Sequence, residues 1–251
     1  NVNDLKKDPI ITFQAKFYVP LVLFSNILVP IFIGWAYKAY TGHGNSIYGV
    51  LVLAGLLRFV LNHHFTFFIN SACHIFGTQP YASKDTSRDN WFLALFTYGE
   101  GYHNYHHTFQ ADYRNGIKWY HYDPTKWMIK SLSLFGLTSN LKKIPERQIL
   151  KATTIQSMAL KKDALYKRLD LKETTLCQKV EKSFNELTQS LNDWLEESQK
   201  YFRFCKDETK SHEEKQTYAE KLEVLKKAFE AQKEQLLKML SAPSVNALQA
   251  V

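Results

Sequence analysis

Several hallmarks of common soluble enzymes are missing from this sequence. It has three cysteines in 251 residues and no Cys-x-x-Cys spacing, so a disulfide scaffold is excluded and free thiols are expected. It has no phosphate-binding loop, no Gly-x-Gly-x-x-Gly turn and no Gly-x-Ser-x-Gly elbow, so nothing indicates a nucleotide-binding enzyme or a serine hydrolase. No nucleic-acid-binding module accompanies the net charge of +8, and no nucleic-acid partner is expected.

The side chains that are present divide the sequence into two unlike parts. Residues 1–145 hold 28 of the 36 aromatic side chains and eight of the nine histidines, with a net charge of +6. Residues 146–251 hold 36 charged side chains, which nearly balance to a net charge of +2. This composition predicts a membrane part with a histidine-rich site in residues 1–145 and a solvated helical extension in residues 146–251.

Two apolar stretches are long enough to cross a bilayer, whose core of ~30 Å needs ~20 helical residues. The first runs over about residues 18–37, carries no charge and contains Pro30, which is expected to kink it. The second runs over about residues 46–76 and contains Arg58 and several histidines, and such groups usually face protein or a water-filled cavity. A buried helix pair in a soluble core is the alternative.

The connection between the two stretches, Lys38–Asn45, is short and predicts a helical hairpin. It carries one lysine, whereas most basic residues of the first part lie outside the hairpin. By the positive-inside rule, both ends of the hairpin are expected on the cytoplasmic side.

Beyond Pro145 the sequence becomes charged and helical in its periodicity. Apolar residues at spacings of three and four predict two helices, over about residues 148–206 and 213–240, paired as an antiparallel, coiled-coil-like hairpin. Ser211 and Glu214 form a candidate capping box at the start of the second helix. Residues from Ser241 onward are expected to be loose.

The strongest local feature is the run Gly99–His107, Gly-Glu-Gly-Tyr-His-Asn-Tyr-His-His. On a helix, positions i, i+3 and i+4 share one face, so His103, His106 and His107 are expected to converge. Neutral imidazole is a common ligand of iron, zinc and copper, which predicts a metal site.

Asn70 and His74 form a second pair at i and i+4, near the end of the second apolar stretch. His74 is a candidate fourth ligand, and Asn70 is a candidate partner of a metal-bound water. His63 lies one heptad before Asn70 on the same face, about 10 Å away along the helix, which is too far for the same ion. Glu100 stands one turn before His103, where either orientation of a ligand imidazole or a surface role fits.

Two of these runs resemble a known family. Asn70–Tyr81 and Gly99–Phe109 closely resemble the membrane acyl-CoA desaturases of the stearoyl-CoA type. Further matches are Arg88-Asp89-Asn90, Asp112-Tyr113-Arg114 and Asp123–Trp127, and the last of these, with the pair His63-His64, resembles bacterial members. The resemblance covers about residues 4–145.

The resemblance implies an oxidoreductase that uses O2 and two electrons to introduce a cis double bond, at delta-9, into a fatty acyl-CoA or acyl-carrier substrate. It implies two iron ions (Fe2+) held by histidines, and electrons from a b-type haem protein or a ferredoxin. The expected fold is all-α: an integral membrane helical hairpin, a cytoplasmic histidine-rich helical cap and the charged C-terminal extension. The bacterial likeness favours the bacterial inner membrane over the endoplasmic reticulum.

By position, the resemblance also assigns site residues. Phe67 occupies the place of an aromatic beside the acyl tunnel, with His63 as a further tunnel residue and Glu100 behind the ligands. The implied metal ligands are His74, His103, His106, His107 and, through water, Asn70.

One departure from the family pattern is large. The family carries two further boxes, a His-x-x-x-x-His pair and a His-x-x-His-His triple, and neither occurs ahead of Asn70. The sequence is therefore expected to be the C-terminal portion of a desaturase and to be inactive alone. A related histidine-box membrane hydroxylase and a non-catalytic truncated membrane adaptor are the alternatives. Arg114 and Lys118 are expected to face an anionic carrier, an acidic electron donor or membrane lipid.

Overall fold

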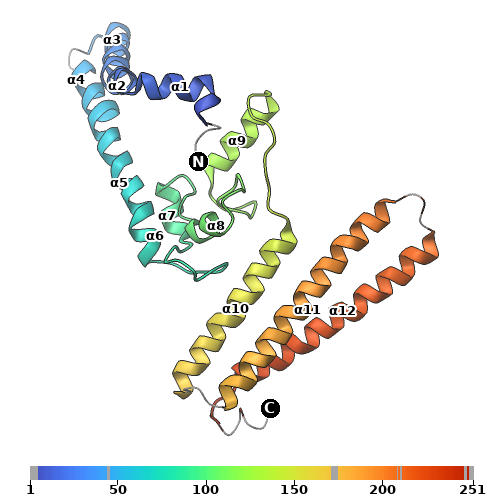
Figure 1. The fold of residues 1–251 in the computed structure, drawn as a ribbon. Helices are drawn as coiled ribbons and strands as arrows, with labels where there is room; N and C mark the ends of the chain where they lie inside the picture. Colours follow the sequence, from blue (N-terminus) through green and yellow to red (C-terminus); the bar gives the residue numbers. More distant parts are fainter. Residues whose placement is uncertain are drawn as a thin grey trace. The chain divides into compact units, whose positions relative to one another are not determined.

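The computed structural model describes residues 5–43, 46–170, 175–207, 209, 211–245 and 248. Over these residues the chain is helical and contains no strand, and Asp89 makes isolated β-bridges to Thr78 and Tyr102. The expected all-α class is therefore confirmed (Figure 1). The chain divides into two compact units, residues 1–72 and 73–251, which are described separately. The boundary expected after residue 145 stays a prediction.

The first unit contains a helical hairpin that follows the short helix α1 (Pro9–Lys16). One arm, Tyr18–Thr41, consists of α2 (Tyr18–Leu23), the π-helical turn η2 (Phe24–Leu28) and α3 (Val29–Thr41). The other arm contains α4 (Ser46–Val50), the π-helical segment η3 (Leu51–Leu57) and α5 (Arg58–Asn70), and the helical path ends with α6 (Ala72–Ile75).

Both helical segments, Tyr18–Thr41 and Ser46–Ile75, are long and apolar enough to cross a membrane. Only 11% and 6% of the residues in their most apolar stretches are buried within the chain. The core helices of a soluble protein would be mostly buried, so this exposure favours the membrane interpretation over a soluble helix pair. Gly44 and Asn45, in the predicted connection, lie outside the described residues.

A π-helical turn, η2, lies just before Pro30, and the expected kink stays a prediction. Proline has no N–H, and its ring crowds the carbonyl four residues earlier, which here belongs to Asn26. The other arm covers that carbonyl closely, because a Cβ at Gly55 would lie 2.6 Å from the Asn26 oxygen. Arg58 donates to the Asn26 side-chain oxygen and, at 2.8 Å, to the Ala54 carbonyl, so the two arms share a polar contact within an apolar setting.

The second unit begins with short helices joined by long loops: α7 (Trp91–Phe96), α8 (His103–Thr108) and α9 (Pro124–Leu134). Side chains just before two of these helices cap them. Asn90 accepts from the amides of Phe92 and Leu93, and Asp123 accepts from the amide of Lys126. Such caps satisfy amides at the first turn that have no partner within the helix.

The helical extension contains three helices, α10 (Glu146–Leu169), α11 (Thr175–Lys206) and α12 (His212–Leu240). The prediction of one continuous helix over residues 148–206 is therefore wrong. The chain leaves the helix at Asp170, which adopts a left-handed conformation (φ 46°) that a short polar side chain tolerates. The break lets α10 fold back on α11, so that Leu165 and Val180 enter the same core.

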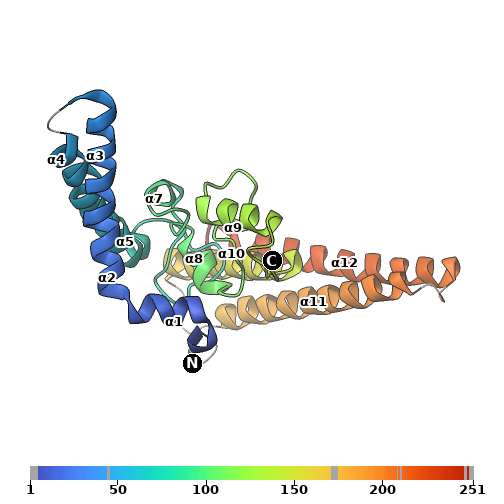
Figure 2. The ribbon, with the colours of Figure 1, turned by 90° about the horizontal axis from the view of Figure 1, so that it is seen from above.

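The antiparallel pairing of α11 and α12 is confirmed. Trp194 stacks on Phe229 at 5.7 Å, and Tyr201 stacks on Tyr218 at 5.5 Å, so the positions rise along one helix as they fall along the other. The two helices lie side by side in both views (Figures 1 and 2). The capping box of Ser211 with Glu214 is present.

The end of the chain is more tightly packed than expected. Ala242 and Leu248 are buried, at 4% and 0% exposure, in the same core as the helices. Arg168 donates to the Ala242 carbonyl. The expectation of a loose segment after Ser241 is wrong for these residues, because Leu248, eight residues beyond the end of α12, still reaches the core.

Candidate metal centre

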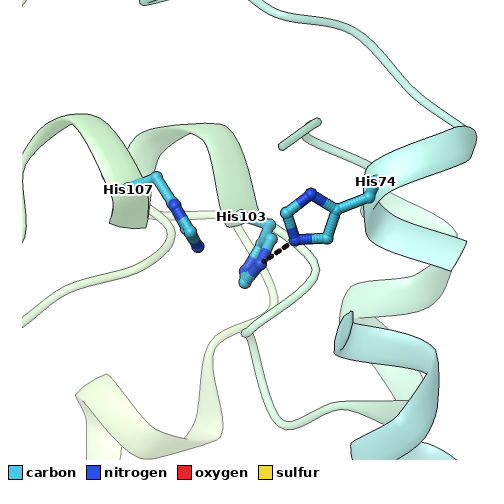
Figure 3. A group of neighbouring side chains, drawn as sticks. All are labelled: His74, His103 and His107. Carbon is cyan, nitrogen blue, oxygen red and sulfur yellow. Dashed lines mark hydrogen bonds between the residues drawn. The ribbon is translucent and has the colours of Figure 1, made fainter. Parts of the chain in front are cut away.

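Three imidazoles from two helices converge in the second unit. His74 comes from α6, and His103 and His107 come from α8 (Figure 3). One ring nitrogen from each lies within 4.8 Å of the others, and the Nε2 atoms of His74 and His103 are 3.1 Å apart. His103 is buried, at 4% exposure, and the other two rings are partly buried.

The donor set fits a transition-metal ion. Nitrogens bound to one ion at ~2.0–2.1 Å lie about 2.8–3.4 Å apart at octahedral or tetrahedral angles, and the two Nε2 atoms already meet that spacing at 3.1 Å. The nitrogen of His107 lies within 4.8 Å of the other two and would have to move closer to bind the same ion. Imidazole suits iron, zinc and copper, so these donors are compatible with the iron that the sequence implies.

The electrostatic setting keeps His103 neutral. Burial, with smaller contributions from the neighbouring rings of His107 and His74, which disfavour a second positive charge, lowers its pKa to about 4. A metal ligand must offer an unprotonated nitrogen, so His103 is ready to bind at neutral pH without losing a proton.

His106 lies beside this group but is not one of the three. Its ring centroid is 6.1 Å from that of His103 and 5.9 Å from that of His107. Helical geometry explains the division. At about 100° per residue, His103 and His107 are offset by about 40°, whereas His106 and His107 are offset by about 100°. The expectation that three histidines of this run converge on one point therefore holds for two of them.

Two loop residues that sequence reasoning missed contact the outer nitrogens of the group. Asp85 Oδ2 lies 3.1 Å from His107 Nδ1, and Thr86 Oγ1 lies 2.9 Å from His74 Nδ1. The only sequence signal was a polar run, residues 83–87, between the two desaturase-like motifs. Glu100 instead accepts from Asn115 Nδ2 at 2.6 Å, and its expected role behind the ligands stays a prediction.

A close backbone contact at Gly101 sets the start of α8. A Cβ at this position would lie 2.2 Å from the Ala94 nitrogen and 2.6 Å from the Asn90 oxygen, and the Asn90 amide donates to the Gly101 carbonyl at 2.8 Å. Only glycine permits such an approach. The glycine two residues before His103 therefore holds the histidine helix against the start of α7.

A buried ion pair lies just after α8. Arg114 donates to both carboxylate oxygens of Asp112, at 2.9 and 2.7 Å, and the Tyr105 hydroxyl and the Ile144 amide also donate to this carboxylate. These donors hold the pKa of Asp112 below its usual value despite burial. Arg114 is thus engaged within the chain, whereas we expected it to face an anionic partner.

Comparison with known proteins decides the family. The family model described as fatty acid desaturase matches residues 3–137. The chain belongs to the fatty acid desaturase family. The three-histidine group lies inside the matched residues.

Several curated proteins are similar to this desaturase chain. Acyl-CoA desaturase 1 of Saccharomyces cerevisiae is 43% identical over 153 residues, which is 61% of this chain and 29% of that protein. The probable acyl-CoA desaturase of Schizosaccharomyces pombe is 41% identical over 157 residues, 62% of this chain and 31% of that protein. The sn-1 stearoyl-lipid 9-desaturase of Synechocystis is 42% identical over 120 residues, 48% of this chain and 36% of that protein.

The desaturase chain thus spans about a third of the length of these relatives. Fungal and cyanobacterial proteins match it about equally well, so the bacterial likeness expected from its sequence is not supported.

The remaining expected site residues of the desaturase chain lie in its first unit. Asn70 donates to the Thr66 carbonyl at 3.4 Å, and Phe67 is 60% exposed. His63 packs on Phe59, with ring centroids 4.2 Å apart, and makes a longer edge contact of 6.3 Å with Phe67. The roles of Asn70 toward a metal-bound water, and of Phe67 and His63 along an acyl tunnel, stay predictions.

Proposed function

We propose that this chain supplies part of the metal centre of a membrane fatty acyl desaturase. The observation that carries the proposal is the convergence of His103 and His107 on His74, which lies in the last turn of a membrane-length helical segment, in a chain of the desaturase family. Iron bound at such a centre would supply the oxidant that an unactivated C–H bond requires, by activating dioxygen.

The residues of the chain perform three tasks in this proposal. The three imidazoles hold one ion, with His103 the most deeply buried of them. His106, and Asn70 through water, take part in a second iron site that further histidines complete. Phe67 and His63 lie along the acyl path, where an apolar wall keeps the chain in one orientation and so determines which C–H bond reacts.

The proposed reaction is insertion of a cis double bond, at delta-9, into a saturated acyl-CoA or other acyl-carrier substrate with O2 and two electrons. The electrons come from a b-type haem protein or a ferredoxin. Both flanks of the hairpin lie on the cytoplasmic side of the membrane. We propose that this membrane is the bacterial inner membrane rather than the endoplasmic reticulum, and fractionation of the native cells tests this.

The chain has a histidine triple but neither of the two boxes expected ahead of it. We therefore propose that it holds part of the ligand set and does not turn over alone. A two-iron, oxygen-reactive centre in the isolated chain would contradict this part of the proposal.

A chimera tests the activity. Residues 3–137 replace the matching segment of the Saccharomyces cerevisiae acyl-CoA desaturase 1, and the acyl products of the membranes are analysed by gas chromatography. We expect a delta-9 alkene, which is lost in the same chimera carrying His103→Ala. An alcohol product would favour the hydroxylase alternative. A chimera that inserts into the membrane and binds iron, yet forms no product, would contradict the proposal.

A further inference from the structure

We propose that Asp85 and Thr86 are positioning residues that orient the rings of His107 and His74 for metal binding. This inference rests on the proposed metal centre. It assigns a role to the loop of residues 78–90, which contacts two of the ligand rings at the nitrogens that would face away from the metal. Neither residue belongs to the histidine motifs, and neither is expected to touch the metal.

The chemistry of imidazole makes these two contacts directional. A neutral ring carries one N–H and one free lone pair, and a hydrogen bond at one nitrogen decides which nitrogen keeps the lone pair. An ionised carboxylate only accepts, so the contact of Asp85 Oδ2 at 3.1 Å requires His107 Nδ1 to donate. His107 Nε2 is then left free for a metal ion. Outer partners of this kind fix ring orientation and raise ligand basicity at metal sites.

Thr86 performs the same task for His74. Its hydroxyl lies 2.9 Å from His74 Nδ1, while the opposite nitrogen, Nε2, faces His103. When His74 Nε2 binds a metal ion, Nδ1 carries the proton and donates it to the Thr86 oxygen. Because a hydroxyl can also donate, Thr86 tolerates both forms of the ring and is the weaker constraint of the two.

The loop itself is held in place, so these contacts are not those of a free surface chain. Asp85 Oδ1 accepts from the Ser87 amide at 2.8 Å and from the Ser87 hydroxyl, and Gln79 donates to the Asp85 carbonyl at 2.6 Å. One face of the carboxylate is therefore fixed by its own loop, and the other face meets His107.

Asn104 fastens this loop to the histidine helix. It stands next to His103, is 1% exposed and uses both ends of its amide. Its oxygen accepts from the Tyr81 amide at 3.0 Å, and its nitrogen donates to the carbonyls of Ala82 at 2.7 Å and Ser87 at 3.1 Å. On the opposite side, the Arg88 amide donates to the Cys73 carbonyl at 2.8 Å, next to His74.

His103 provides an internal contrast. Its Nδ1 is buried and has no hydrogen-bond partner among the residues that the structure describes. The outer nitrogens of His107 and His74 are thus hydrogen-bonded, whereas the outer nitrogen of His103 is not. The simpler alternative is that Asp85 and His107 form an ordinary surface pair, since their side chains are 46% and 35% exposed. Such a pair contributes at most about 1 kcal/mol to stability and would not affect metal affinity.

Cobalt titration of the whole chain separates these alternatives. The chain is purified in detergent and titrated with Co2+ under anaerobic conditions, and visible absorption reports the affinity and the ligand field. Asp85→Ala and Thr86→Val are expected to weaken binding by about 10–100-fold. Asp85→Asn and Thr86→Ser keep an acceptor oxygen and are expected to restore most of the affinity. Lys84→Ala, at an exposed position of the same loop, is the matched control.

The outcomes also separate this inference from the metal centre on which it rests. Wild-type affinity and an unchanged cobalt spectrum in both Asp85→Ala and Thr86→Val, with binding abolished by His103→Ala, would overturn the positioning role and leave the metal centre intact. Binding that is insensitive to His103→Ala would overturn the metal centre itself. Circular dichroism of each variant, with retained helical content, confirms that it is folded.

Discussion

The Nε2 atoms of His74 and His103 lie 3.1 Å apart, although the two residues are separated by 29 positions in the sequence. The first lies in the last turn of a membrane-length helical segment, and the second begins a short helix held by a loop. This proximity joins the two desaturase-like motifs into one candidate site. It also leads to predictions in which individual histidines have different effects.

Replacing His74 or His107 with alanine should abolish tight binding of one transition-metal ion. Each supplies one of three ring nitrogens, so the loss of metal affinity should exceed the ~10–100-fold effect of replacing a residue that only hydrogen-bonds to a ligand. His106→Ala is the matched control from the same helix and should leave this affinity unchanged, because its ring lies outside the group of three. Co2+ titration measures both. Equal losses of affinity in all three variants would contradict the assignment of His74 and His107, but not His106, to this metal site.

Acid should destabilise the metal-free chain, in part through His121. Burial, with smaller contributions from Lys118 and Lys126, lowers the pKa of His121 to about 4, from a usual value near 6.5. The unfolded chain therefore binds a proton before the folded chain does, and this contribution to stability is lost as the pH falls from about 6.5 to 4. His121→Phe keeps the stack on Tyr102 and should flatten the fall of Tm over this range. An unchanged slope would contradict the assignment.

Gly101→Ala should disrupt the start of the histidine helix. The new Cβ would meet backbone atoms of Ala94 and Asn90, which cannot yield as a flexible side chain can. We expect the free energy of unfolding to fall by about 1–3 kcal/mol, together with weaker Co2+ binding. Gly49→Ala, where a Cβ meets nothing within 4 Å, is the control. Thermal unfolding in detergent measures the loss, and equal Tm values for the two variants would contradict the close contact.

Arg114→Ala should destabilise the chain rather than act on a partner. It leaves the carboxylate of Asp112 buried without its cation, a change that typically costs about 3–5 kcal/mol. Lys118→Ala is the control, because its ammonium group lies over the Tyr120 ring 5.5 Å from the centroid. If Arg114→Ala kept the wild-type Tm and lost affinity for an acidic donor or carrier, the internal role would be wrong.

The core of the helical extension gives a prediction independent of metal. Leu191 is fully buried between the helices, so Leu191→Ala should cost about 2–5 kcal/mol. Val224→Ala, at 67% exposure on α12, should cost little. Hydrogen exchange of the α11 and α12 amides measures both effects, and similar protection in the two variants would contradict the packing described here.

Sequence periodicity captured the features that depend on local geometry. The two membrane-length helices, the capping box at Ser211 and the approach of His103 to His107 all follow from spacing within one segment. The break at Asp170 did not, because the apolar spacing of the helices on either side is compatible with one long helix. Only the shared core of α10 and α11 shows that the chain must reverse there.

The loop residues of the site could not be predicted for a different reason. Asp85 and Thr86 lie between two recognisable motifs in an irregular segment. In such a segment, sequence spacing does not show which way a side chain points. Their place beside His107 and His74 depends on long-range bonds, chiefly those of Asn104. Glu100, one helical turn from His103, was the better candidate by spacing, yet its carboxylate bonds to Asn115.

The most direct test of the central claim is X-ray absorption of the chain loaded with Fe2+ under anaerobic conditions, with the iron content determined on the same sample. We predict bound iron whose scattering includes imidazole ligands, and loss of that iron in the triple variant His74→Ala, His103→Ala, His107→Ala. Iron content and scattering that are the same in the wild-type chain and in the triple variant would contradict the assignment of these histidines as a metal centre.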